Sequence, residues 1–307
     1  MADLGTATVP VVAVLIAVGI VVFLVVVIWS MKRHRNPTLH VDCDAPIGDL
    51  IPSLAGLTLS TAVDGNSVEV LENGAYFDVL VDEIAAAQRS VHFETFLWKE
   101  GVLGQRIADT LSERARAGVT VRVLVDANGS RKMGKSAKEQ LKSAGCKFEM
   151  FHKWSLHHIG VMNERDHRKL TVVDGRVALV GGHCIVDTWL GNAEDKNHFA
   201  DVSVRLEGPI VNSVQAAFSE NWVGQTGELF MGDGVFPHLE PAGDVTIHAA
   251  YAKPEGSAPA VKILHHAVIG LARKRIWIQN PYFIPEPEAI DAFGAAVKRG
   301  VDVRVMM

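Results

Sequence analysis

Residues 166–175 of the chain are Asp166-His167-Arg168-Lys169-Leu170-Thr171-Val172-Val173-Asp174-Gly175. The apolar and β-branched residues in this stretch predict a strand. Alternate residues of a strand project from the same face of a sheet, so we expect His167 and Lys169 to point together and Arg168 to point the other way. The stretch therefore predicts a histidine and a lysine that act at one place on a sheet.

Asp174-Gly175 is a two-residue hairpin signal, and residues 176–180 supply the returning strand. With these two residues as the loop, the count along the hairpin pairs Lys169 with Val180. A hairpin of this kind brings the residues that follow the returning strand back beside the histidine and the lysine.

The same count places Gly182 opposite His167, with Gly181 next to it. Glycines at this place leave room for an oxyanion and could offer it their backbone N–H groups. An imidazole beside a lysine suits phosphoryl transfer, because histidine can attack phosphorus or protonate a leaving oxygen while lysine neutralises the developing charge.

The composition is that of a folded protein, with 307 residues, of which 48% are hydrophobic and 21% charged, enough for one large core or two moderate ones. The net charge of -5 argues against a nucleic-acid binder with a broad basic face. Cys43, Cys146 and Cys184 are odd in number and lack CxxC spacing, so they support neither a disulfide framework nor a zinc site. We expect the folded part to lie in a reducing compartment.

The N-terminal region contains twenty-one consecutive uncharged residues from Val9 to Trp29, enough to cross a bilayer as a helix. Asp3 and the absence of Lys or Arg before this run argue against a signal peptide. Lys32 and Arg33 follow the run, and positive charge on this flank predicts a single-pass protein of the cell membrane with its catalytic domain in the cytoplasm. We assign residues 1–30 to a transmembrane anchor.

Residues 31–66 contain several Pro and Gly and little periodicity, which predicts a juxtamembrane connector. Helical and strand patterns then alternate. Phe77, Leu80 and Ile84 share one helical face, and a strand pattern follows at 91–98. A second helix, which Gly118 closes, precedes the strand 119–125. The pattern predicts an α/β fold with a mixed or largely parallel sheet flanked by helices.

Six basic residues surround a short apolar helical stripe between positions 131 and 147. This pattern is typical of a solvated face, and in a tethered protein it also suits contact with anionic lipid. The residues are Arg131, Lys132, Lys135, Lys138, Lys142 and Lys147.

An internal similarity links residues 114–123 to residues 296–305, with Gly118 and Gly300 at equivalent positions. A repeat separated by this length of chain indicates a duplicated half-domain rather than a solenoid unit.

The repeat predicts a domain order for the rest of the chain. We expect a first half at 67–228, a linker at 229–258 and the start of a second half at 259–307. The same offset places the second copy of the histidine motif beyond Met307, so we expect the second half to be incomplete in this sequence.

The combination His167-x-Lys169-x4-Asp174, followed by Gly181-Gly182, resembles the signature of the phospholipase D superfamily. Residues 93–98, 205–209 and 280–285 are similar to its bacterial cardiolipin synthase branch. The resemblance covers roughly residues 73–307.

The resemblance implies two α/β halves about a pseudo-twofold axis, each with one His-Lys-Asp motif at a shared active site. It implies a two-step transfer without metal or other cofactor, in which one histidine becomes a phosphohistidine and the other acts as acid and then base. For a cardiolipin synthase, two phosphatidylglycerol molecules give cardiolipin and glycerol.

By the same resemblance, His167 is the nucleophile or its acid–base partner, and Lys169 is a phosphate ligand. Asp174 is the supporting carboxylate, although its place at the hairpin turn predicts a structural role. Asp201 matches a carboxylate that orients the histidine, with an ordinary strand-start residue as the alternative and Glu194 or Asp195 as rivals. The expected substrate-binding residues are Gly181, Gly182, Glu94 and Tyr282.

Two departures from the family pattern stand out. Cys184 occupies a position where many members have Asn, and no second His-x-Lys-x4-Asp occurs in the 307 residues. The paired histidines at 157–158 and 265–266 lack the lysine, and without Cys or carboxylate partners at ligand spacing they do not predict a metal site.

Three functions remain open at this point. The first is a membrane-tethered phosphatidyltransferase of the cardiolipin synthase type that acts on phosphatidylglycerol. The second is a phospholipase D-type phosphodiesterase or nuclease that completes its site as a homodimer, and the third is an inactive fragment with an exposed sheet edge. The anchor and the negative charge favour a lipid substrate over nucleic acid. The same motif serves lipid, alcohol and water acceptors.

Overall fold

The computed structural model describes residues 8–33, 39, 41, 43–153, 164–251 and 260–307. The chain divides into two compact units. The large unit is the continuous stretch Thr61–Ala249, and the small unit consists of Met1–Ser60 and Ala250–Met307. Each unit has its own sheet and is described separately.

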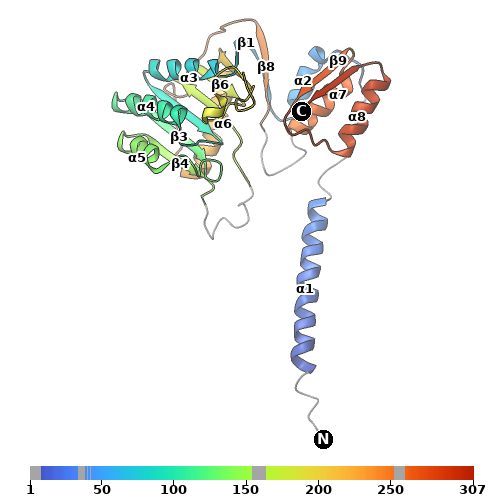
Figure 1. Cartoon of the computed structure of the whole chain (residues 1–307). Helices are drawn as coiled ribbons and strands as arrows, with labels where there is room; N and C mark the ends of the chain where they lie inside the picture. Colours follow the sequence, from blue (N-terminus) through green and yellow to red (C-terminus); the bar gives the residue numbers. More distant parts are fainter. Residues whose placement is uncertain (1–7, 34–38, 40, 42, 154–163, 252–259) are drawn as a thin grey trace. The chain divides into compact units, whose positions relative to one another are not determined.

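The large unit is built on one eight-stranded sheet with the order β4-β3-β2-β5-β6-β7-β1-β8 (Figure 1). Its elements are β1 (Thr61–Glu72), α3 (Ala75–Ala86), β2 (Ser90–Thr95), α4 (Val102–Arg116), β3 (Thr120–Asp126), α5 (Lys135–Ser143), β4 (Lys147–Phe151), β5 (Leu170–Val173), β6 (Val177–Gly181), η3 (Asp187–Trp189), β7 (Val202–Glu207), α6 (Val211–Thr226) and β8 (Val245–Ala249).

The sheet is mixed. Strands β2, β3 and β4 are parallel because α4 and α5 form the crossovers between them. The pairs from β2 through β5, β6, β7, β1 and β8 are antiparallel. Of the two arrangements that the sequence left open, the structure has the mixed one, because helical crossovers occur only in the β2–β4 part.

Helices cover both faces of the sheet. Helices α3, α4 and α5 lie over one face, where Phe77, Leu80 and Ile84 are completely buried, as their helical spacing predicts. Helix α6 contacts β2, β4, β5 and β6. Strand β2 separates the two layers, since Phe93 belongs to the core under α3–α5 whereas Glu94 bonds to α6. The face under α6 carries the polar residues that matter for the site.

The hairpin turn forms as predicted, but the pairing of its two strands differs from the predicted register. Asp174 and Gly175 both have positive φ (52° and 66°), and the Arg176 N–H donates to the carbonyl of Val173 (2.9 Å). The ladder then pairs Val173 with Val177, so Arg176 is an extra residue on the returning strand.

The consequence is a shift of one residue along the hairpin. Leu170 pairs with Val180, and the Gly181 N–H donates to the Lys169 carbonyl (3.2 Å), so the predicted pairing of Lys169 with Val180 is wrong. Strand β5 also begins at Leu170, which leaves His167 and Lys169 just before it. The physical reason is the extra residue at Arg176, and the turn is also held to β2, where the Asp174 N–H donates to the Ser90 carbonyl (2.8 Å).

The small unit contains η1 (Ile47–Leu50), α2 (Ile51–Leu57), α7 (Ala260–Leu271), β9 (Arg275–Gln279), α8 (Pro287–Lys298) and β10 (Asp302–Met306). Strands β9 and β10 are parallel, over a small core that includes Ile276, Ala296 and Val301. The β9–α8–β10 arrangement matches β2–α4–β3, and Gly118 and Gly300 both have φ near 90° after their helices. The internal repeat is therefore a repeated βαβ unit.

The predicted connector and linker both contain regular structure. The range 31–66 includes η1, α2 and the start of β1, and the range 229–258 includes β8. Strand β1 pairs with β8, with Thr61 opposite Ala249. This pairing joins two segments that are far apart in sequence, so local composition could not reveal it.

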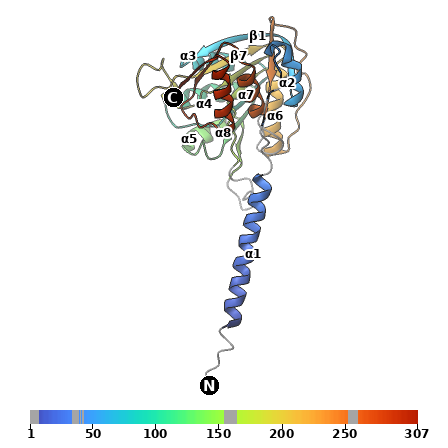
Figure 2. The same cartoon turned by 90° about the vertical axis from the view of Figure 1, so that its right-hand side faces the viewer.

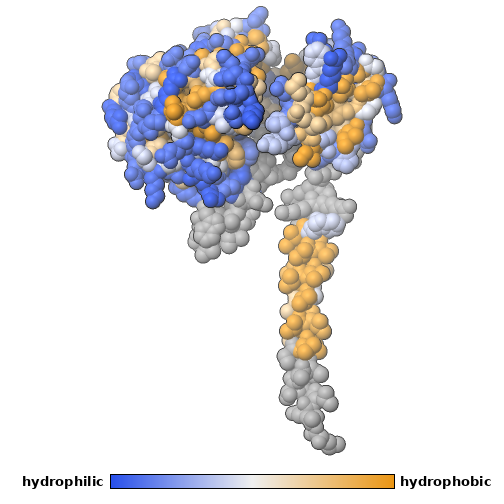
Figure 3. Space-filling view, in the orientation of Figure 1, coloured by the Kyte–Doolittle hydropathy of each residue, from blue (hydrophilic) through white to orange (hydrophobic). Residues whose placement is uncertain are grey.

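Helix α1 (Thr8–Arg33) is continuous over its described length (Figures 1 and 2). Its segment Val11–Trp29 has a mean hydropathy of 3.6, and none of it is buried. Figure 3 shows the surface of this segment as mostly hydrophobic (orange). By length and composition the helix can cross a membrane.

Candidate functional site

The structure brings His167 and Lys169 together on one aromatic ring. The imidazole of His167 stacks on Phe96 with ring centroids 4.0 Å apart and an angle of 17° between the planes. The Lys169 Nζ lies 5.3 Å from the centre of the same ring. Phe96 directly follows β2, so the end of this strand forms the floor under both side chains.

The surroundings of His167 favour a neutral imidazole. Partial burial and then the positive charge of Lys169 lower the pKa of His167, whereas Asp126 and Asp166 act in the opposite direction. The residue is exposed, and its ring has no hydrogen bond among the described residues. An exposed neutral imidazole has a nitrogen lone pair available for attack on an electrophile.

Two buried carboxylates hold the backbone next to His167. The Asp166 N–H donates to Asp126 Oδ2 (3.1 Å), and the Arg168 N–H donates to Asp166 Oδ1 (3.0 Å). Asp126 ends β3 and accepts two further N–H groups on its other oxygen, from Asn128 (2.9 Å) and Gly129 (2.8 Å). The peptide units on both sides of His167 are thus fixed from within the protein.

Arg168 points away from His167 and Lys169, as the strand alternation predicts. Its Nη1 donates to the carbonyl of Ala217 (2.7 Å) and its Nη2 to Glu220 (2.9 Å), both on α6. Arg168 therefore binds the site segment, residues 166–169, to α6. His167 and Lys169 project from the opposite side of this segment.

Glu94 lies under the site segment and does not face solvent. Its side chain is 1% exposed, and Oε1 accepts a hydrogen bond from Asn221 Nδ2 (2.6 Å) on α6. Burial, and then the neighbouring Asp166, raise the pKa of Glu94 well above its ordinary value. The predicted contact with substrate has no support in this geometry, because the carboxyl group is enclosed.

Gly181 and Gly182 are required for close packing of β7. A Cβ on Gly181 would overlap Ser203, and a Cβ on Gly182 would overlap the Asp201 carboxylate. Their N–H groups already donate to the carbonyls of Lys169 and Val202, respectively. The expectation that these N–H groups are free for an oxyanion is therefore wrong.

Asp174 has the structural place that the hairpin predicted. Its carboxylate accepts hydrogen bonds from the backbone N–H groups of Gln88 (2.9 Å), Arg89 (2.7 Å) and Ser90 (2.8 Å). Three backbone donors saturate most of its acceptor capacity, so Asp174 ties the hairpin to the start of β2.

Asp201 has no hydrogen bond to His167 in the described part of the chain. Its Oδ2 accepts a hydrogen bond from Trp189 Nε1 (2.8 Å). Burial lowers the pKa of His183, and the charge of Asp201 opposes this effect. Cys184 is also buried near Asp201, and burial raises the pKa of the Cys184 thiol. The rivals for the orienting role, Glu194 and Asp195, lie next to His198 in an exposed loop.

Tyr282 lies in the small unit, where its side chain is 82% exposed. Among the described residues, no group of three or more His, Cys, Asp or Glu side chains is arranged to hold a metal ion. His157 and His158 lie outside the described residues.

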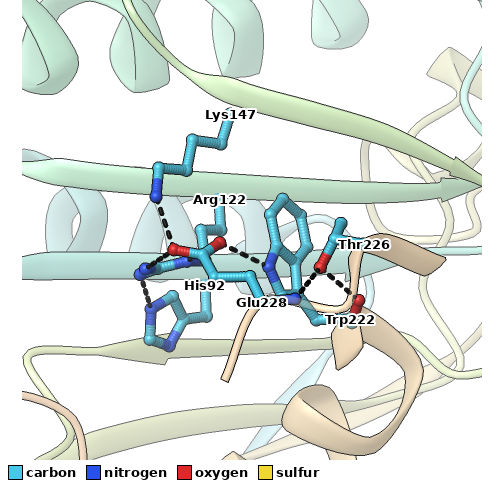
Figure 4. Close-up of polar contacts among 6 residues, drawn as sticks. All are labelled: His92, Arg122, Lys147, Trp222, Thr226 and Glu228. Carbon is cyan, nitrogen blue, oxygen red and sulfur yellow. Dashed lines mark hydrogen bonds and ion pairs between the residues drawn. The ribbon is translucent and has the colours of Figure 1, made fainter. Parts of the chain in front are cut away.

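A second polar network occupies the same face of the sheet, further along β2 (Figure 4). Buried His92 donates from Nδ1 to Gln215 Oε1 (2.7 Å) and accepts at Nε2 from Arg122 (3.1 Å). Arg122 Nη2 in turn donates to Glu228 Oε1 (2.8 Å), which also pairs with Lys147. Every charged member of this network has a partner.

The sequence did not identify several residues of the site. No sequence pattern assigned a role to Phe96, Asp126, Asp166 or Asn221. Asp126 carries one available signal, since a carboxylate that ends a buried parallel strand often lies at a functional edge of the sheet.

Comparison with known proteins identifies the large unit. Residues 80–222 match the family model described as cardiolipin synthase, PLD-like domain. The chain belongs to the phospholipase D superfamily. The match begins within α3 and ends within α6, and it includes all of the segment between these helices that builds the site.

The similar curated proteins are cardiolipin synthases. The chain is 32% identical over 263 residues to the major cardiolipin synthase ClsA of Bacillus subtilis, which covers 84% of this chain and 55% of that protein. It is 32% identical over 279 residues to a cardiolipin synthase of Geobacillus thermodenitrificans, covering 90% of this chain and 53% of that protein. The chain thus spans about half the length of these relatives.

A solved structure shares the fold at low sequence identity. The phosphatidylserine synthase of Haemophilus influenzae superposes with a TM-score of 0.57 and 14% identity, over 83% of this chain and 65% of that one. This likeness supports the phospholipase D-like fold of the chain.

Proposed function

We propose that the chain contributes one half of the active site of a membrane-tethered phosphatidyltransferase of the cardiolipin synthase type. The observation that carries the proposal is the exposed imidazole of His167, stacked on Phe96 with Lys169 over the same ring. The cardiolipin synthase relatives support the choice of reaction.

In the first step, His167 attacks the phosphorus of phosphatidylglycerol. The P–N bond forms as the P–O bond to the terminal glycerol breaks, and the glycerol oxygen takes a proton from a general acid. The lowered pKa of His167 favours the neutral form that this attack needs. Lys169 stabilises the negative charge on the non-bridging oxygens.

In the second step, a hydroxyl of another phosphatidylglycerol attacks the phosphohistidine. Its proton passes to the general base, the P–N bond breaks, and cardiolipin and the neutral imidazole are released. The general acid and base is proposed to be the histidine of a second His-Lys-Asp motif, which the 307 residues do not contain.

The lipid substrate and the membrane are proposed as the partners of the site. Helix α1 is long and apolar enough to anchor the chain, and Lys32 and Arg33 follow its apolar segment. Basic residues on this flank favour a cytoplasmic catalytic domain. A site held near the bilayer would meet phosphatidylglycerol at high local concentration.

The test uses the natural protein, produced from its own gene in cells that lack other cardiolipin synthases. We expect His167→Ala to lower cardiolipin formation, measured by lipid mass spectrometry, by at least about 1,000-fold, because no nucleophile replaces the imidazole. The matched control is His198→Ala, which removes a histidine of the same unit from an exposed loop and should leave synthesis unchanged. Equal synthesis by wild type and His167→Ala would contradict the proposed role.

A further inference from the structure

Two buried carboxyl groups under the site each have one oxygen without a hydrogen-bond partner in the part of the chain that the structure describes. Glu94 is 1% exposed and Asp166 is 4% exposed. Asn221 bonds to Oε1 of Glu94, and the Arg168 N–H bonds to Oδ1 of Asp166. The remaining oxygens, Glu94 Oε2 and Asp166 Oδ2, are buried and have no hydrogen-bond partner among the described residues.

The two side chains lie beside each other. Glu94 is in β2, opposite Leu170 at the start of β5, and Asp166 precedes that strand by a few residues. Burial raises the pKa of Glu94 most, and the neighbouring charge of Asp166 raises it further. Two adjacent ionised carboxylates would repel one another, and each would bury an unsatisfied acceptor.

The charges around the pair do not compensate two anions. Arg168 is engaged with Glu220 on α6, and Arg165 lies 3.9 Å from Asp126, a further buried carboxylate. A neutral His167 adds no positive charge. A single proton between Glu94 and Asp166 would remove one negative charge and make one carboxyl group a donor to the other.

We propose that Glu94 and Asp166 share one proton and that this carboxyl–carboxylate pair positions His167. The catalytic consequence rests on the proposed function, whereas the shared proton does not. Both are positioning residues, since neither side chain faces the substrate side of the site.

The geometry explains how the pair acts on His167. Glu94 lies two residues before Phe96, and Asp166 lies one residue before His167, so the carboxyl pair and the stacked rings join the same two segments. The proton joins Glu94 to Asp166, and this bond holds Phe96 and His167 in their stacked position. Burial raises the pKa of Asp166 as well as that of Glu94, which favours retention of the proton.

The first test is infrared spectroscopy of the full chain in detergent. A shared proton predicts a carboxylic C=O band at neutral pH, separate from the ionised carboxylates, that Asp166→Asn removes or shifts. The amide that this substitution introduces can donate to Glu94 in place of the proton and still accept from Arg168, so the variant should fold normally. A wild-type spectrum without such a band at neutral pH would overturn the proposal.

The second test follows thermal unfolding between pH 5 and pH 9. The folded pair retains a proton that the unfolded carboxyls, with ordinary pKa values of 4.5 and 3.8, have lost. Its stabilising effect therefore declines as pH rises from these values to the raised pKa of the pair. Asp166→Asn should flatten this decline, and an unchanged profile would contradict the shared proton.

The third test addresses positioning through the imidazole NMR signals of His167. Asp166→Asn should leave their shifts and titration close to wild type, whereas Asp166→Leu should change both because leucine cannot bond to Glu94. In the natural protein we expect Asp166→Leu to lower synthesis about 100-fold and Asp166→Asn to restore most of it, as expected for a displaced reacting group.

The outcomes separate the two proposals. If His167→Ala retains synthesis while the band and the pH effect are present, the proposed function fails and the carboxyl pair stands. If His167→Ala abolishes synthesis but the band is absent, the pair fails and the function stands. Should Asp166→Leu not fold, the wild-type spectrum and the Asp166→Asn profile still decide the question.

Discussion

His92 and Glu94 lie two residues apart on β2 and point toward the same helix, yet the polar networks that they join differ. In the first, Arg122 connects His92 to Glu228, and each charged group has a hydrogen-bonded partner (Figure 4). In the second, Glu94 and Asp166 each have one buried oxygen without a hydrogen-bond partner in the described part of the chain.

The difference follows from what each network does. The first fastens residues beyond the end of α6 to the sheet, since Glu228 follows Gly227, which ends the helix with φ of 69°. The second supports the backbone next to His167. Local departures from complete pairing are tolerated at functional sites. We therefore assign the network of His92, Arg122 and Glu228 to stability of the fold, and we propose that Glu94 and Asp166 support the candidate site.

Removal of Arg122 from the network of His92, Arg122 and Glu228 should lower the free energy of unfolding more than any other change proposed for this network. Arg122→Met leaves His92 Nε2 without its donor and Glu228 without its main cation, so we expect unfolding free energy to fall by about 3 kcal/mol. Denaturant titration in detergent measures this change. The matched control Arg131→Met removes an exposed arginine and should change stability by less than about 0.5 kcal/mol. Similar losses for both variants would contradict the role given to Arg122.

Lower pH should weaken the network of His92, Arg122 and Glu228 but not the contact between Glu94 and Asp166. Burial lowers the pKa of His92 to about 4, while hydrogen bonding to Gln215 opposes this and Arg122 adds to it. The unfolded histidine therefore binds more protons than the folded one between about pH 6.5 and pH 4, and stability falls as pH falls through this range. The loss should be of the order of 2 kcal/mol.

The direction of this effect is opposite to that expected for the Glu94–Asp166 pair. Thermal unfolding of wild type and His92→Gln across pH 4 to 7 separates them, because the variant should lack the His92 contribution. An equally steep acid limb in His92→Gln would show that another group dominates. Glu228, whose pKa Arg122 and Lys147 hold at about 2, should contribute only below its ordinary value of 4.5.

Removal of Lys147 should have the smallest effect. Its Nζ pairs with Glu228, but 51% of its side chain is exposed, so solvent and salt screen the interaction. We expect Lys147→Met to lower unfolding free energy by no more than about 0.5 kcal/mol, and the difference to vanish at high salt. A loss comparable to that of Arg122→Met, measured by the same denaturant titration, would argue against this ranking.

Much of the fold was predictable because its signals are local. The spacing of Phe77, Leu80 and Ile84 follows from the helical period, and these residues are buried as expected. Gly118 and Gly300 end equivalent helices with the same positive φ, which only a residue without a side chain adopts freely. The pairing of β1 with β8 was not predictable, because it joins segments that are far apart in the sequence. The hairpin register was not predicted because Arg176 is an extra residue on the returning strand.

The sequence by itself determined the family motif, the apolar helix and the alternation of helices and strands from α3 to β3, since backbone periodicity and turn chemistry act over a few neighbouring residues. Only the tertiary structure decided what surrounds His167. It placed Phe96 beneath the imidazole and the acid pair beneath the segment, and it directed the glycine N–H groups to backbone carbonyls. The physical reason is that burial and pairing of charges depend on groups that meet only when the sheet and α6 pack together.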